Sequence, residues 1–152
     1  MPPRRREVSP PVRAAVASRL ADAIAQEDAV AFAYLFGSFA EDRPCEDVDV
    51  AVFVDDGLVS EDERLGFAVQ LSGRLDRVLA PEGLTADVVV LNGAPLGLRL
   101  AAVRGRVLFS RDEARRLSFI EETALQAMDT ACLRRDSLRE LLRPDSSPAD
   151  RP

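Results

Sequence analysis

Two aspartates one residue apart in an apolar run are the side chains in this sequence best placed to do chemistry. Asp47 and Asp49 open the stretch DVDVAVFV, whose β-branched and aromatic residues otherwise predict a buried strand. Side chains at positions i and i+2 of a strand share one face, so the two residues would lie about 6 to 7 Å apart. At about 6 Å and an effective dielectric constant of about 20, two carboxylates repel each other by about 2.8 kcal/mol. The pair therefore predicts a site for a cation.

The other residue types in the chain restrict which cation this could be. The chain has no histidine, and all 20 of its basic residues are arginine. Its two cysteines, Cys45 and Cys132, are far apart and in no metal-binding spacing. Ser-His-Asp hydrolysis and lysine-based phosphate binding therefore lack their required groups. Oxygen ligands alone favour magnesium or manganese over zinc, and magnesium commonly takes substrate phosphates as further ligands. A nucleotide substrate is expected.

A phosphate-binding turn and a third carboxylate complete this hypothesis. Gly37 ends the apolar run AVAFAYLFG, and Ser38 would open a helical turn whose backbone N–H groups face an anion. Asp87, in TADVVVL, is the only other acid embedded in a strand-like apolar run. If its strand neighbours that of Asp49, Asp87 would be either a shared metal ligand or the base that takes a proton from an attacking hydroxyl.

The elements that must position these residues alternate between strands and helices. Apolar runs predict strands over residues 29–37, 47–55, 84–92 and 106–110. Helical periodicity and capping residues predict helices over residues 11–26, 60–79, 94–105 and 112–142. A helix connects the second strand to the third, as a parallel or mixed sheet requires.

The last predicted helix is too long for a domain of this size. At 1.5 Å per residue it would extend about 46 Å. One face carries seven apolar residues, namely Leu117, Ile120, Ala124, Met128, Ala131, Leu138 and Leu141. This apolar stripe could belong to the core, form a homodimer seam or seat a protein partner, and the sequence leaves these alternatives open.

Composition bounds the remaining possibilities. A chain of 152 residues that is 47% hydrophobic predicts one domain, expected over residues 11–143, with disordered ends at 1–10 and 144–152. The net charge of −6 argues against a stable grip on nucleic acid, so a small ligand or a protein partner is expected. No apolar run approaches the roughly 20 residues of a membrane span, and no secretion signal is evident. We therefore expect a cytoplasmic protein with no membrane contact.

The stretch GSFAEDRPCEDVDVAVFV followed by ADVVVLN resembles the nucleotidyltransferase superfamily that shares the palm of DNA polymerase β. Within it, the short chain and the segment VVVLNGAPLGLRLAAVRGRVLFSRDEARR are similar to the minimal nucleotidyltransferases, in particular the MntA antitoxins encoded beside HepT toxins. The resemblance covers roughly residues 12 to 140.

This resemblance implies a fold, a reaction and roles for five residues. The fold would be an α+β palm with a mixed sheet, helices packed on it and a long C-terminal helix. Gly37 and Ser38 would hold the triphosphate of ATP, Asp47 and Asp49 would bind two Mg²⁺ ions, and Asp87 would be the third ligand and the base. The protein would transfer AMP from ATP to a tyrosine of a HepT-like ribonuclease and so silence it.

Two other functions fit the same residues. The turn between Ser38 and Asp47 has eight residues where many relatives have ten, and Asp42 and Glu46 stand where a glycine and a serine are often found. A non-catalytic antitoxin that neutralises its partner by binding is therefore one alternative. A nucleotidyltransferase that acts on a small molecule is the other.

Overall fold

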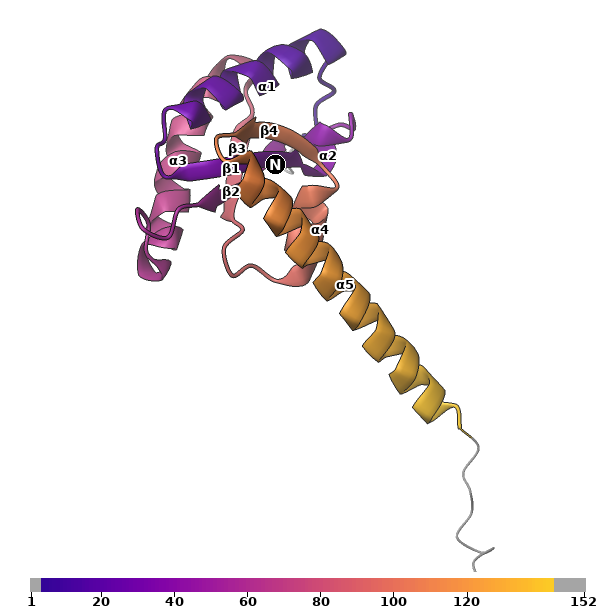
Figure 1. The fold of residues 1–152 in the computed structure, drawn as a ribbon. Coiled ribbons are helices and arrows are strands. Elements are labelled where there is room, and N and C mark those ends of the chain that lie inside the picture. Colours follow the sequence, from indigo (N-terminus) through magenta and orange to yellow (C-terminus); the bar gives the residue numbers. More distant parts are fainter. Residues whose placement is uncertain (1–3, 144–152) are drawn as a thin grey trace, which may run out of the picture.

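Four strands form one mixed sheet with helices on both faces (Figure 1). The computed structural model describes residues 4–143. The strands are β1 (Val30–Phe36), β2 (Asp47–Val54), β3 (Thr85–Val90) and β4 (Arg106–Ser110). The α-helices are α1 (Pro10–Ala25), α2 (Gly37–Ala40), α3 (Arg64–Leu79), α4 (Leu96–Val103) and α5 (Glu113–Leu141), and short 3-10 helices lie at η1 (Glu61–Glu63) and η2 (Ala80–Glu82).

The strand order is β3-β2-β1-β4, and the direction of each strand follows from its connection. A short turn returns the chain from β1 to β2, so these two strands are antiparallel. Helix α3 carries the chain from β2 back to the start of β3, which makes those two strands parallel. Strand β4 pairs antiparallel with β1 at the other edge. The predicted α+β fold with a mixed sheet is confirmed.

The period of two in β2 sorts its residues between the two faces of the sheet. Val48, Val50 and Val52 belong to the core formed with α1 and α3. Ala51 and Phe53 belong to a second cluster on the opposite face. Because side chains alternate along a strand, Asp47 and Asp49 also project from this second face.

The second face is covered by the start of α5 and by α4. Phe119 of α5 is 3% exposed, and its ring centroid lies 5.5 Å from that of Phe32 and 5.6 Å from that of Phe53. Thr123, one turn further, is the last buried residue of α5 within the described residues. Beyond it the helix leaves the body of the domain (Figure 1).

The apolar stripe predicted on the last helix is not the part of α5 that packs against the sheet. Phe119 and Thr123 are the buried residues of α5, and neither belongs to that stripe. Met128 is 64% exposed and Leu141 is 80% exposed. Of the alternatives left open by the sequence, a place in the core is therefore wrong for most of the stripe.

The N-terminal segment is more ordered than the sequence predicts. Disorder is expected through residue 10, whereas the backbone of Arg6 exchanges hydrogen bonds of 2.9 and 3.0 Å with that of Cys45, and α1 begins at Pro10. This pairing joins segments far apart in the chain and leaves no local pattern. Residues 1–3 and 144–152, also expected to be disordered, lie outside the described residues.

Two further predictions from the sequence concern the start of α3 and contact with a membrane. Ser60 and Glu63 form the predicted capping box, which opens a 3-10 turn before α3 rather than α3 itself. Within residues 4–143, no helix combines the length and the apolar composition needed to cross a membrane.

Replacing Phe119 should unfold the protein more easily, because this ring anchors α5 to the sheet. Phe119→Ala should lower the free energy of unfolding by about 3 to 4 kcal/mol, measured by urea denaturation. The matched control is Met128→Ala on the exposed part of the same helix, which should change it by less than about 0.5 kcal/mol. Similar losses in both variants would contradict the packing described for α5.

Candidate active site

Strand register brings Asp87 beside Asp49. The two residues are Cα partners in the parallel pair of β2 and β3, where neighbouring strands lie about 4.8 Å apart. Asp47 is paired in the same way with Thr85. The alternation along both strands puts the three aspartates on the face opposite α1 and α3. The structure therefore gathers Asp47, Asp49 and Asp87 at one end of the sheet.

Asp49 is the electrostatic centre of this group. It is half-buried, whereas Asp47 and Asp87 are exposed. Burial, followed by the negative charges of Asp87 and then Asp47, raises the pKa of Asp49 to about 6. Each cause disfavours the ionised carboxylate, and a divalent cation would offset all three.

The side chain of Asp47 has a protein partner of its own. The hydroxyl of Thr85 donates a hydrogen bond of 2.5 Å to Oδ1 of Asp47. Within residues 4–143, no three Cys, His, Asp or Glu side chains stand in an arrangement that would enclose a metal ion. Rotating Asp47 toward Asp49 would give up one hydrogen bond, worth about 1 kcal/mol. The donor atoms of this group are all carboxylate oxygens, the ligand type that Mg²⁺ and Mn²⁺ prefer, and a cation would offset the charges of Asp87 and Asp47 that raise the pKa of Asp49.

Gly37 lies directly against Asp49. Phe36, the preceding residue, is the Cα partner of Asp49 across β1 and β2. Gly37 has φ of +74°, and a Cβ at this position would overlap Oδ2 of Asp49. Only glycine satisfies both the backbone conformation and the close approach. Ser38 follows as a half-buried residue of the short helix α2, so the predicted phosphate-binding turn adjoins the carboxylates.

A buried arginine holds the turn between Ser38 and Asp47. The side chain of Arg13 is anchored by three backbone carbonyls, donating to the oxygens of Val8 at 2.8 Å, Phe39 at 2.7 Å and Arg43 at 2.8 Å. Its guanidinium carbon also lies 5.0 Å from the centroid of the Phe39 ring. These bonds tie α1 to the segment that carries the predicted phosphate-binding turn.

Along the first predicted helix, Val12, Val16, Leu20 and Ile24 recur every four residues, which predicts that Val12 is buried and gives Arg13 no role. The structure reverses the two, because Arg13 is 6% exposed and Val12 is 36% exposed. The spacing that could have revealed this is Arg13, Val16, Leu20 and Ile24, which places a charged residue in line with three apolar ones.

The shortened turn contains an unusual backbone conformation at Asp42. Its φ is +56°, the left-handed region where glycine is favoured. The carboxylate of Asp42 accepts a bond of 3.1 Å from Arg106 of β4, which fastens the tip of the turn to the sheet edge.

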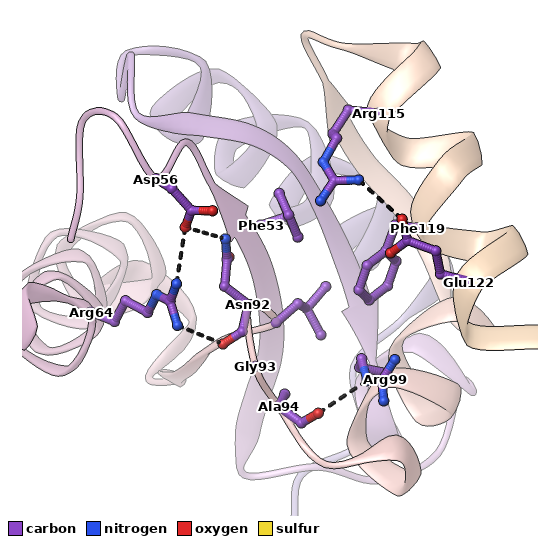
Figure 2. Close-up of a pocket in the computed structure, with 11 residues that line it drawn as sticks. Phe53, Asp56, Arg64, Asn92, Gly93, Ala94, Arg99, Arg115, Phe119 and Glu122 are labelled. Carbon is purple, nitrogen blue, oxygen red and sulfur yellow. Dashed lines mark hydrogen bonds and ion pairs between the residues drawn. The ribbon is translucent and has the colours of Figure 1, made fainter. Parts of the chain in front are cut away.

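A separate hollow of about 400 Å³ lies away from the carboxylates (Figure 2). Phe53, which lines it, is four residues along β2 from Asp49, about 13 Å away. Arg64 and Arg115 at its rim pair with Asp56 at 2.9 Å and Glu122 at 3.6 Å. This hollow is lined by ion pairs internal to the protein and is not the site that the aspartates form.

Comparison with protein families decides the assignment of the domain. The family model described as polymerase beta, nucleotidyltransferase, matches residues 18–114. The chain belongs to this nucleotidyltransferase family. The matched range includes the five residues singled out in the sequence, which are Gly37, Ser38, Asp47, Asp49 and Asp87.

The fold of this nucleotidyltransferase is similar to that of chains in solved toxin–antitoxin complexes. One complex contains a tri-AMPylated Shewanella oneidensis HEPN toxin and an MNT antitoxin, with a TM-score of 0.58 and 19% identity over 85% of this chain and 98% of that chain. A second is the toxin–antitoxin MntA-HepT, with a TM-score of 0.57 and 18% identity over 84% and 97% of the two chains. A third is a toxin–antitoxin with AMP-PNP, with a TM-score of 0.59 and 20% identity over 82% and 97%. A search of curated proteins gives no match.

Adding a methyl group at Gly37 should disturb its close packing against Asp49 directly. Gly37→Ala should lower the free energy of unfolding by about 1 to 3 kcal/mol, since it strains the backbone and displaces Asp49. The control is Gly66→Ala in α3, where an added Cβ would have no atom within 4 Å outside its chain neighbours and the backbone of its own helix. The free energy of unfolding of this variant should rise by up to about 1 kcal/mol. Urea denaturation measures both. A Gly37→Ala variant as stable as the wild type would contradict the close approach to Asp49.

Removing the charge of Asp49 should stabilise the apo protein at neutral pH but not in acid. The pKa of Asp49 is raised from 3.8 to about 6, so the folded state holds this proton more tightly, and stability falls as pH rises from about 4 to 6. At pH 7.5 in EDTA, the free energy of unfolding of Asp49→Asn should therefore exceed that of the wild type by about 1 kcal/mol, a figure reduced for solvent screening because Asp49 is half-exposed. The advantage should vanish at pH 4. If the variant and the wild type differed in stability by the same amount at pH 7.5 and at pH 4, the raised pKa of Asp49 would be contradicted.

Proposed function

We propose that this nucleotidyltransferase is an antitoxin that transfers AMP from ATP to a tyrosine of a HepT-like ribonuclease toxin. The observation that carries the proposal is the register of Asp49 with Asp87, on the same face as Asp47, in a nucleotidyltransferase domain. The similar solved complexes include one with a tri-AMPylated toxin and one with AMP-PNP. Both support ATP as the nucleotide and a toxin as the acceptor.

Five residues would carry the reaction. The backbone N–H groups at Gly37 and Ser38 would bind the triphosphate. The carboxylates of Asp47, Asp49 and Asp87 would hold two Mg²⁺ ions. When bound, such ions neutralise charge that develops on the phosphates and on the leaving group.

The reaction would be an in-line displacement at the α-phosphorus of ATP. The tyrosine oxygen of the toxin forms a bond to that phosphorus, the bond between the α-phosphorus and the bridging oxygen breaks, and pyrophosphate leaves with the electron pair. Asp87, exposed at the edge strand β3, would accept the proton of the attacking hydroxyl. None of these roles needs the histidine or lysine that the chain lacks.

The remaining parts of the proposal concern the setting of the protein. We place it in the cytoplasm, because ATP and an intracellular ribonuclease would be encountered there. Its net charge of −6 supports recognition of the toxin itself rather than of the toxin's RNA substrate.

One observation favours a second candidate function. Asp47 accepts a hydrogen bond from the hydroxyl of Thr85. A former metal site that no longer binds metal would also show this hydrogen bond. An antitoxin of that kind would neutralise its partner by covering it, without transferring AMP.

The experiment compares labelling and neutralisation. Purified protein is incubated with α-labelled ATP, Mg²⁺ and the product of the neighbouring reading frame, which the proposal expects to be a HepT-like protein. The wild type should label a toxin tyrosine and abolish ribonuclease activity. Asp47→Asn combined with Asp49→Asn should lose labelling at least about 100-fold and lose neutralisation. Asp22→Asn, at an exposed position of α1, serves as the control and should retain both.

Two outcomes would contradict the proposal. Neutralisation that survives in the double variant would establish covering of the toxin as the mechanism. Label that appears on a small molecule, with none on the toxin, would show a different acceptor.

A further inference from the structure

The distal half of α5 exposes apolar side chains that nothing in residues 4–143 covers. Every residue from 131 to 143 is exposed. Leu138 is 58% exposed and Leu141 is 80% exposed. Exposed leucines scattered singly need no explanation, but several along one free helix mark an interaction surface.

These side chains continue a groove between α4 and α5. Leu96 and Leu100 of α4 form one wall, and Ala127, Ala131 and Leu138 form the other. The three α5 residues are four and seven positions apart, so they share one side of the helix. The hollow has a volume of about 800 Å³. In Figure 1 α4 lies beside α5, and the distal part of α5 extends past it.

The groove could hold either a second copy of this chain or a helix of a partner protein, and the charged residues that line it distinguish between the two. Arg134 and Arg135 line the hollow together with the apolar residues. A second copy of this chain, laid antiparallel about the middle of residues 127–142, would set its own Arg134 and Arg135 against these. Like charges facing each other disfavour that pairing. A helix whose apolar stripe is flanked by aspartates or glutamates would complement both the leucines and the arginines.

We propose that the groove between α4 and α5 docks an amphipathic helix of the partner protein, with an apolar stripe flanked by acidic residues. The inference rests on the proposed function only in naming the toxin as the owner of that helix. The groove shares no residue with the carboxylate site, so a helix in the groove need not contact Asp47, Asp49 or Asp87. The distal half of α5 thus supplies affinity for the partner, and the aspartates supply the reaction.

The test measures binding of the purified HepT-like protein to the full chain by calorimetry. Leu138→Glu should weaken binding at least tenfold, because it puts a charge into the apolar groove. Arg134→Glu combined with Arg135→Glu should do the same, and the affinity of the wild type should fall as NaCl rises. These side chains are exposed or line an open groove, so all variants should remain folded.

Two control variants match these changes. Leu133→Glu alters a leucine that is 68% exposed on the same helix, about 140° around from Leu138 at 100° per residue. Arg77→Glu reverses an exposed charge on α3, across the sheet. Both should bind the partner as the wild type does.

The outcomes separate this inference from the proposed function. Groove variants that bind as tightly as the wild type overturn the docking site, whatever AMP transfer shows. Tight wild-type binding that the groove variants lose, without any AMP transfer, supports the docking site and overturns the proposed reaction. A homodimer of the chain alone that Leu138→Glu dissociates and Leu133→Glu does not would assign the groove to a second copy and overturn the inference.

Discussion

Repulsion among three carboxylates at one end of a sheet is the constraint on which the site depends. Strand register puts Asp87 directly opposite Asp49, and the period of two puts Asp47 on the same face. The fold therefore concentrates negative charge there, and burial of Asp49, followed by the charges of Asp87 and Asp47, raises the pKa of Asp49 to about 6. Such a group is costly to an apo protein and useful to one that binds a divalent cation and a nucleotide.

The rest of the domain holds this arrangement against its own repulsion. Helices α1 and α3 bury one face of the sheet, and the start of α5 buries part of the other through Phe119. Gly37 lets β1 turn against Asp49 without a side chain in between. Arg13 then fixes the returning turn by three hydrogen bonds to backbone carbonyls. A small domain can position a charged site in this way because its larger core cluster, formed with α1 and α3, lies on the opposite face.

Local patterns in the sequence were sufficient for most of the fold. The predicted strand over 47–55 is found as Asp47–Val54, and the helix over 11–26 as Pro10–Ala25, because apolar periodicity records which face each element buries. Contacts between distant segments left no such record. The pairing of Arg6 with Cys45 was therefore missed. The burial of Arg13 is a different case, because its helical spacing with Val16, Leu20 and Ile24 does carry a local signal. The stripe on α5 was read correctly as apolar, but the sheet has room only for the first turns of that helix.

Crystals grown with Mn²⁺ and a non-hydrolysable ATP analogue would test the central claim most directly. Anomalous diffraction locates manganese independently of the protein. The account predicts manganese bonded to the carboxylates of Asp47 and Asp49, with Asp87 alongside and the phosphates against the backbone of Gly37 and Ser38. Manganese found only elsewhere, or Asp87 turned away from the other two aspartates, would contradict it.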